Sequence, residues 1–205
     1  MSSKIKKNIL KLKESSTLVI NEKSKELISQ GKKVYQFGFG QSPFPVPEKI
    51  VETLKQNAHR KEYLPVQGLS ELREKISKYL FKETGNTYPK ENILITPGSK
   101  EAMLLTHLAF NGDILIPAPG WVSYEPQAEV GSNKAHWIET SKSNNWYPTE
   151  KELENNIKKV GKKKNLILIL NSPNNPSGAV CNNLNDLAKI AKKYKLLILS
   201  DEIYT

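Results

Sequence analysis

The chain has 205 residues, 38% of them hydrophobic and 25% charged, which is the composition of a folded globular domain. Its single cysteine, Cys181, excludes an internal disulfide and a cysteine-based metal cluster, and its three histidines share no metal-binding spacing. The formal charge of +10 comes almost entirely from lysines dispersed among glutamates, so we interpret it as solvated surface rather than a nucleic-acid-binding face.

The first ten residues are basic but lack the apolar core and the cleavage site of a signal peptide. No run in the chain approaches the roughly eighteen apolar residues of a membrane span. We therefore expect a cytoplasmic protein that binds neither a membrane nor a nucleic acid.

The N-terminal part of the chain has the pattern of helices joined by loops. Residues 1–15 resemble a loose basic arm, and an apolar run from Val34 predicts a short strand that breaks into glycines and prolines. Asn21 and Gly31 have the residue types of a helix start and a helix stop. The spacing of apolar residues predicts helices over residues 21–31, 47–57 and 70–81.

From Tyr88 onward, strand and helix patterns alternate. Strands are predicted at residues 93–95, 113–116, 136–138, 165–170 and 196–200, and helices at 101–110, 149–159 and 185–194. Thr149, with Glu152 three residues later, has the capping-box spacing of a helix start. This alternation predicts an α/β fold: a partial three-layer sandwich around a mostly parallel sheet, truncated because no covering helix follows the last strand.

Ligands of open parallel sheets bind beyond the carboxyl ends of the strands, so the turns that follow the strands are the candidate sites. At the first turn, Gly98, Ser99 and Lys100 open a helix, and helix N-H groups, a hydroxyl and an ammonium can together bind a phosphate. This turn matches neither the dinucleotide fingerprint nor a Walker loop, and a purely structural turn is the alternative.

Three further turns carry polar or aromatic side chains. Trp121 and Tyr124 follow two prolines, which predicts that both rings are exposed and that Trp121 can stack on a flat ring, although a large apolar filler is the alternative. Asn175 lies in a turn made rigid by prolines and offers both donors and acceptors. Asp201 and Tyr204 add a carboxylate and a phenol, with an N-cap role as the alternative for Asp201.

A flat, phosphorylated, basic heteroaromatic molecule would use all four turns. Pyridoxal phosphate is such a molecule, since its pyridine nitrogen needs a carboxylate to stay protonated and its ring oxygen needs hydrogen-bond donors.

Six motifs, in this order, then carry a resemblance to the N-terminal half of the class I/II aminotransferases, the fold type I pyridoxal-phosphate enzymes, over roughly residues 14–205. They are Gly38-Phe-Gly-Gln-Ser-Pro-Phe44 with Pro47-Glu48, Tyr63-Leu-Pro-Val-Gln-Gly-Leu-Ser-Glu-Leu-Arg73, Thr96-Pro-Gly-Ser-Lys-Glu-Ala102, Pro119-Gly-Trp-Val-Ser-Tyr124, Asn171-Ser-Pro-Asn-Asn-Pro-Ser-Gly178 and Ser200-Asp-Glu-Ile-Tyr204.

The resemblance implies a role for each cofactor-binding position. Asp201 would pair with the pyridine nitrogen, Asn175 and Tyr204 would hydrogen-bond the ring oxygen, and Trp121 would stack on the ring. The phosphate would be held by three residues of the first turn, Gly98, Ser99 and Lys100. Tyr63 would reach the phosphate of a neighbouring subunit, which implies a homodimer.

The resemblance also implies an amino acid and a 2-oxo acid as substrates, with Gly40 and Asn175 near the substrate carboxylate. Thr17 and Lys100 match positions that contact an acidic substrate side chain in one subgroup. It further implies that residues 1–45, an arm and a helix, contribute to the small domain, and that residues 46–205 form an incomplete pyridoxal-phosphate-binding domain.

The Schiff-base lysine of this family lies some tens of residues beyond the Asp201–Tyr204 turn, so no catalytic residue is predicted in the chain, and the 205 residues alone are expected to be inactive. Three alternatives stay open: a lyase or synthase on the same scaffold, a non-catalytic dimerising or regulatory fragment, and a nucleic-acid-binding protein.

Overall fold

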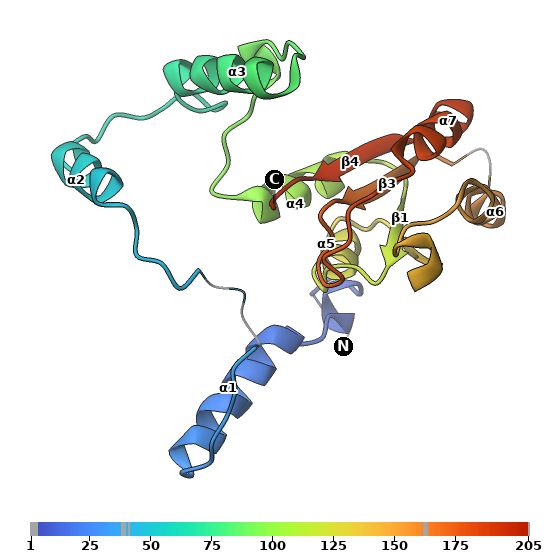
Figure 1. The fold of residues 1–205 in the computed structure, drawn as a ribbon, viewed down its shortest axis with the longest axis horizontal. Coiled ribbons are helices and arrows are strands. Elements are labelled where there is room, and N and C mark those ends of the chain that lie inside the picture. The colour runs from blue at the N-terminus through green and yellow to red at the C-terminus, as the bar shows by residue number, and fades with distance from the viewer. Residues whose placement is uncertain (1–3, 38–39, 41, 162–163, 205) are drawn as a thin grey trace. The chain divides into compact units, whose positions relative to one another are not determined.

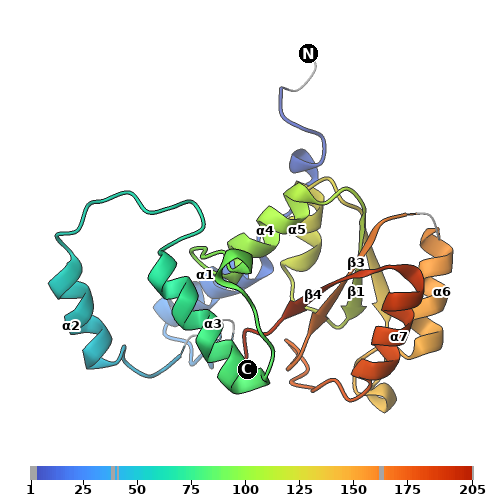
Figure 2. The ribbon, with the colours of Figure 1, turned by 90° about the horizontal axis from the view of Figure 1, so that it is seen from above.

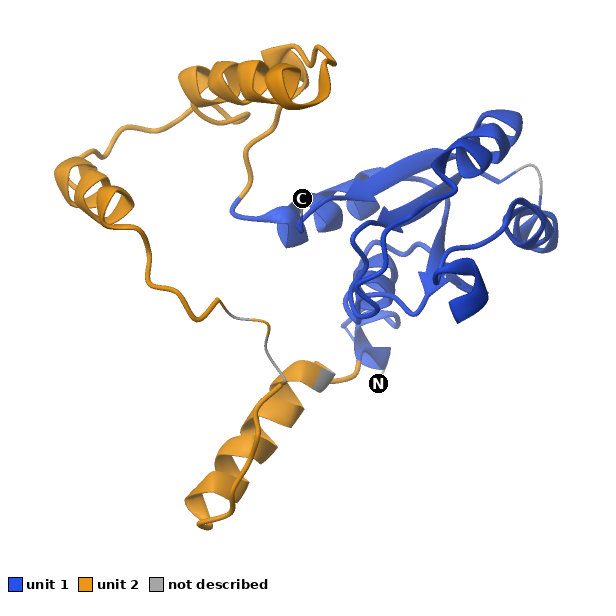
Figure 3. Ribbon diagram, viewed as in Figure 1, with its two compact units in different colours: residues 1–12, 97–205 blue, residues 13–96 orange. Residues whose placement is uncertain are grey.

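The computed structural model describes residues 4–37, 40, 42–161 and 164–204. The chain forms two compact units, one of residues 1–12 and 97–205 and the other of residues 13–96 (Figure 3). The predicted division at residue 45 concerns the domains of a whole fold type I enzyme, and it stays a prediction.

The unit of residues 13–96 is helical, as predicted, but its boundaries differ from the prediction. Its helices are α1 (Ser16–Ser29), α2 (Glu48–Asn57), α3 (Ser70–Thr84) and the 3-10 turn η2 (Lys90–Asn92). Helix α1 begins earlier than predicted, and Ser15 rather than Asn21 is its N-cap residue. Helix α3 begins at Ser70, as predicted, and extends to Thr84, three residues beyond the predicted end, where Gly85 caps it with a left-handed φ of 72°.

Two predicted strands of this unit are absent from its described residues. Residues 34–37 are not in a strand, and residues 38–39 and 41 lie outside the described residues. Residues 93–95 are also irregular, although the Ile95 N-H donates to the Gln67 carbonyl at 3.0 Å, as in a ladder. A short apolar run without a partner strand cannot satisfy its backbone groups as a sheet does.

The loop that follows Tyr63 is held by a buried guanidinium. Arg73 is 7% exposed and donates from Nη1 to the Lys90 carbonyl (2.8 Å) and to Gln67 Oε1 (3.0 Å), and from Nε to the Gly68 carbonyl (3.3 Å). These bonds satisfy the buried charge with carbonyl oxygens and fix the shape of the loop.

The other unit contains the predicted parallel sheet, which has four strands rather than the five that the sequence pattern suggests. The strands are β1 (Asp113–Ala118), β2 (Ala135–Glu139), β3 (Leu166–Asn171) and β4 (Leu197–Asp201), in the order β2-β1-β3-β4. The helices are α4 (Ser99–Ala109), α5 (Tyr124–Val130), α6 (Glu150–Val160) and α7 (Leu184–Tyr194), with the 3-10 turns η1 (Ile9–Lys11) and η3 (Lys142–Asn144).

Alternate residues of the strands pack into two separate cores. Leu115 and Leu168 face one core, which α6 and α7 cover. Ile114 and Ile167 face the other, which α4 and α5 cover. Every residue of β3 is buried, as expected for a central strand with helices on both faces. Figure 2 shows this three-layer arrangement, with α6 and α7 on one side of the sheet and α4 and α5 on the other.

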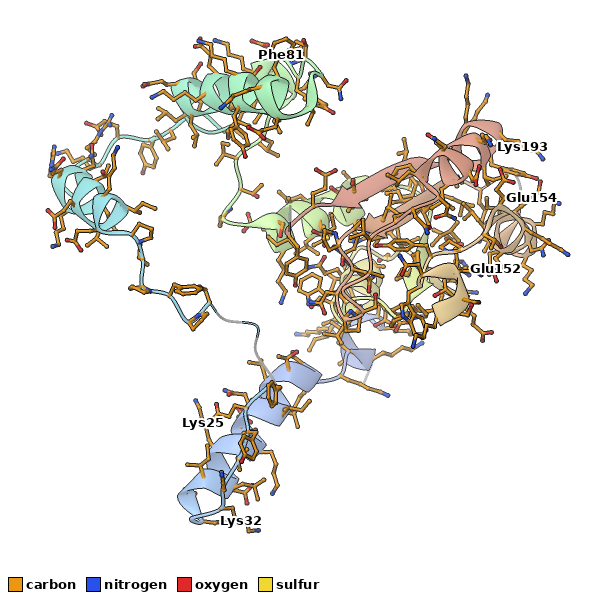
Figure 4. All side chains as sticks on the ribbon, viewed as in Figure 1. Lys25, Lys32, Phe81, Glu152, Glu154 and Lys193 are labelled. Atoms are coloured by element: carbon orange, nitrogen blue, oxygen red, sulfur yellow. The ribbon has the colours of Figure 1, made fainter. Side chains whose placement is uncertain are left out.

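The predicted capping box at the start of α6 is present. The Glu152 N-H donates to the Thr149 hydroxyl, and the Glu152 carboxylate accepts from the Thr149 N-H at 2.8 Å. Further along α6, Glu154 accepts from Lys193 on α7 at 2.7 Å (Figure 4) and from the Tyr194 hydroxyl at 2.6 Å. Hydrogen bonds from these two residues and from Lys158 lower the pKa of Glu154 to about 2.

The predicted basic arm is in part attached to the sheet-containing unit. Asn8, just before η1, donates from Nδ2 to the Glu129 carbonyl at the end of α5, 2.6 Å away (Figure 1 shows the N-terminal segment beside α5). The described residues contain no helix that is long and apolar enough to cross a membrane.

Candidate functional site

A pocket of about 130 Å³ lies beyond the carboxyl ends of β3 and β4, within the sheet-containing unit. Its lining residues come from α4, the turn after β1, the start of α5 and the ends of the last two strands: Ser99, Met103, Trp121, Tyr124, Asn171, Asn175, Asp201, Ile203 and Tyr204. The pocket lies where the turns after the strands converge, which is where ligands of open parallel sheets bind.

The register of β3 and β4 brings Asn171 and Asp201 together at the floor of the pocket. They are paired residues at the ends of adjacent strands, and Asn171 Nδ2 donates to the Asp201 carbonyl at 2.9 Å. Strand side chains alternate between faces, so Asn171 follows Ile169, and Asp201 follows Leu199, on the face that α4 and α5 cover. On this face, each strand is apolar up to its last residue, and the polar last residue lines the pocket.

The Asp201 carboxylate is 8% exposed and accepts a hydrogen bond from the Tyr124 hydroxyl, with 2.6 Å between Oη and Oδ2. Tyr124 is the first residue of α5 and is 1% exposed, so the prediction that its ring is exposed is wrong. Burial, together with the hydrogen bond to the anionic Asp201, raises the pKa of the Tyr124 phenol far above its ordinary value. The phenol is therefore a permanent donor to this carboxylate.

The turn after β3 is ordered by hydrogen bonds to Asn171 and from Tyr147. The Asn175 N-H donates to Asn171 Oδ1 at 2.7 Å. The buried Tyr147 hydroxyl shares its single proton between the carbonyls of Asn171 (2.7 Å) and Ala179 (3.0 Å), one at each end of the turn. Asn175 Nδ2 then donates to the Tyr204 hydroxyl at 2.9 Å, which joins this turn to the one after β4.

Trp121 forms the aromatic wall of the pocket. Its ring meets that of Tyr124 edge to face, with centroids 5.5 Å apart and an interplanar angle of 83°. The Lys100 ammonium lies 5.5 Å from the Trp121 ring centroid, within cation–π range. The half-buried indole thus lies between a cation and a T-shaped partner that fix its orientation.

The start of α4 supplies the candidate phosphate-binding turn. Gly98 is the N-cap residue, with φ 152° and ψ 163°, and Ser99 is the first helical residue. A Cβ atom placed on Gly98 would meet no atom of the described residues within 4 Å, so there is room beside this glycine. Because a helix N-terminus favours anions, this end of α4 suits a phosphate group.

The structure brings together most of the sequence-predicted residues of this unit. Ser99, Trp121, Asn175, Asp201 and Tyr204 line one pocket, Gly98 precedes it, and Lys100 is directed to its aromatic wall. Three other predicted residues belong to the unit of residues 13–96: Tyr63 has an exposed side chain in the loop held by Arg73, Thr17 is in α1, and Gly40 lies between α1 and α2. Their roles stay predictions.

Sequence reasoning missed the residues that hold the others in place. The sequence assigns no ligand contact to Asn171, Tyr124 or Met103, although Asn171 and Tyr124 lie in the family motifs and Tyr124 is predicted to be exposed. The strand register would have revealed Asn171, because it is opposite Asp201. Nothing in the pattern around Tyr124 shows that its ring turns inward.

Comparison with known proteins gives the family. The model of the family "Aminotransferase class I and II" matches residues 32–205. The chain belongs to this family.

Several curated aminotransferases are similar to the chain along nearly all of its length. The aspartate aminotransferase of Thermotoga maritima is 32% identical to it, over 98% of the chain and 54% of the relative. The bifunctional aspartate and glutamate/aspartate-prephenate aminotransferase of Petunia hybrida is 35% identical, over 94% of the chain and 41% of the relative. The chain spans about half the length of the curated relatives it matches.

Solved aminotransferases share the fold as well. The crystal structure of the Thermotoga maritima enzyme matches with a TM-score of 0.88 and 31% identity, over 98% of the chain and 54% of that structure. The Rhizobium meliloti aspartate aminotransferase matches with a TM-score of 0.89 and 26% identity, over 98% of the chain and 52% of that structure. The four-stranded sheet and its helices are therefore part of the fold type I architecture.

Proposed function

We propose that this aminotransferase-family chain binds pyridoxal phosphate in the pocket beyond β3 and β4. As part of a complete enzyme, it would transfer an amino group between an amino acid and a 2-oxo acid. The observation that carries the proposal is the convergence of a carboxylate, a phenol–amide pair, an aromatic wall and an open helix N-terminus on one pocket.

The donor set of the pocket fits this cofactor. When bound, pyridoxal phosphate supplies an electron sink whose strength depends on a protonated pyridine nitrogen. Asp201 would hold the proton at that nitrogen, because a buried carboxylate favours an adjacent cation. Asn175 and Tyr204 would donate to the ring oxygen, and Trp121 would cover one face of the ring and keep water from it.

The phosphate would lie at the start of α4, held by the Ser99 hydroxyl and the N-H groups that follow Gly98. Lys100 adds a positive charge beside this end of the pocket. Tyr63 would reach the phosphate of a second subunit, which makes the homodimer part of the proposal. The cytoplasmic location also remains part of it.

The named relatives favour amino transfer over a lyase or synthase reaction. Those of Thermotoga maritima and Petunia hybrida carry names that specify aspartate, glutamate or prephenate. An acidic substrate would suit the predicted contacts of Thr17 and Lys100 with its side chain and of Gly40 and Asn175 with its α-carboxylate.

The test uses deoxypyridoxine phosphate, an analogue that lacks the aldehyde and so cannot react with the many lysines of the chain. Equilibrium dialysis against the 205-residue chain should show binding that Asp201→Asn weakens by roughly tenfold or more, the usual effect of losing a hydrogen bond to a charged group.

Asp186→Asn is the matched control, because Asp186 is an exposed residue of α7 whose carboxylate pairs with Lys189. This variant should bind like the unmutated chain. The proposed cofactor site would be refuted if the chain did not bind the analogue. It would also be refuted if Asp201→Asn left the affinity as unchanged as Asp186→Asn does.

A further inference from the structure

Tyr124 has no role in the predicted set of ligand contacts, yet its hydroxyl makes one of the shortest hydrogen bonds in the pocket. It donates to Asp201 Oδ2 at 2.6 Å, and no other side chain in the described part of the chain donates to this carboxylate. The two residues are far apart in sequence, on α5 and β4, so the fold itself brings them together.

Both partners of this hydrogen bond are held rigidly. The Tyr124 ring is 1% exposed, packs in the core between the sheet and α4–α5, and meets Trp121 edge to face. The Asp201 backbone is paired with Asn171, whose side chain binds its carbonyl. One carboxylate oxygen is thus fixed by a buried donor, and the orientation of the carboxylate is set before any ligand arrives.

The phenol also fixes the direction of the hydrogen bond at the site. A protonated phenol donates, and a carboxylate that accepts from it keeps lone pairs for a second donor such as a protonated ring nitrogen. Because burial keeps the phenol protonated, this donor stays in place over the pH range in which proteins function.

We propose that Tyr124 is a positioning residue for Asp201, which orients the carboxylate toward a basic nitrogen in a ring bound in the pocket. The inference rests on the proposed function, since it assigns the ring nitrogen of the cofactor to Asp201. It adds that recognition of this nitrogen depends on a residue that does not itself contact it.

The test compares two ligands in the 205-residue chain: deoxypyridoxine phosphate and its carbocyclic counterpart, in which a C-H group replaces the ring nitrogen. Tyr124→Phe removes only the hydroxyl. It should weaken binding of the pyridine ligand roughly tenfold, by the usual strength of a hydrogen bond to a charged group, and leave the carbocyclic ligand unchanged.

A structural role alone would move both affinities together, so an equal loss for the two ligands, or no loss for either, overturns the proposal. Trp121→Phe is the matched control, because it reduces the stacking area and should weaken both ligands. If the unmutated chain binds neither ligand, or does not prefer the pyridine one, the proposed function fails rather than the role of Tyr124.

A measurement on the unmutated chain covers the case in which Tyr124→Phe does not fold. The assigned ¹³Cζ resonance of Tyr124 should shift when the pyridine ligand is added and stay in place with the carbocyclic one. Only the pyridine ligand has a ring nitrogen that can pair with Asp201, the carboxylate to which Tyr124 donates. Equal shifts with both ligands contradict the proposal.

Discussion

Tyr147→Phe should loosen the turn that carries Asn175 without disturbing the packing around it. The hydroxyl is buried, and its single proton is shared between the carbonyls of Asn171 and Ala179, which lie at the two ends of this turn. Removal of the hydroxyl leaves the ring in its core position, so no large cavity forms.

The expected cost follows from this shared hydrogen bond. A neutral hydrogen bond contributes about 0.5–1.5 kcal/mol to stability, and a buried acceptor left without a donor costs about 1–3 kcal/mol. Tyr147→Phe should therefore lower the free energy of unfolding by about 1–3 kcal/mol. Urea unfolding followed by tryptophan fluorescence measures this loss in the sheet-containing unit, because Trp121, Trp137 and Trp146 all belong to that unit.

The matched control is Tyr194→Phe, which removes a hydroxyl that donates to Glu154 at 2.6 Å near the surface. Glu154 keeps Lys193 and Lys158 as partners, so this change should cost much less. If Tyr147→Phe costs no more than Tyr194→Phe, the shared hydrogen bond of Tyr147 does not hold the turn and the reasoning is wrong.

Two further changes test the cores of the two units. His107 is fully buried, neither of its ring nitrogens has a hydrogen-bond partner among the described residues, and burial lowers its pKa below 6.5. Below pH 6.5 the unfolded chain then binds a proton that the folded chain does not, so stability falls as the pH falls. His107→Leu should remove this acid loss, measured by urea unfolding between pH 7 and about 5, without a loss of stability at pH 7; an unchanged pH slope would contradict it. Gly68→Ala should destabilise the helical unit by at least about 1–3 kcal/mol, because Gly68 has φ +92° and its Cβ would lie 2.5 Å from that of Ile95. Gly85→Ala, at φ +72° with nothing within 4 Å, isolates the backbone strain, and far-ultraviolet circular dichroism should show the smaller loss there.

The elements of the sheet-containing unit were predictable because their signals are local. The apolar run of β3 and the Thr149–Glu152 pair at α6 each identify an element without reference to the rest of the chain. The predicted strand at residues 93–95 failed for the opposite reason. Its three apolar residues satisfy a local pattern, but a strand forms only when it pairs with another strand. The local pattern does not show whether such a partner strand is available.

The same distinction applies to the site. Asn175 and Asp201 could be predicted because they follow strands, and parallel strands end at one edge of a sheet. The inward turn of Tyr124 could not, because the prolines before it mark a turn without giving the direction of the side chains that follow. Contacts that join distant segments, such as that of Tyr124 with Asp201, require the fold.

The paired positions of Asn171 and Asp201 limit how the gene can vary. Side chains of a strand alternate between faces, so a one-residue deletion within β3 or β4 would turn the terminal polar residue from the α4–α5 face to the α6–α7 face. A change of the same size between α6 and β3, at the amino ends of the strands, would leave both residues in register. Tolerance to insertions and deletions should therefore be higher in the connection before β3 than within β3 or β4, which a deletion scan of the chain would measure as retained binding of the pyridine ligand.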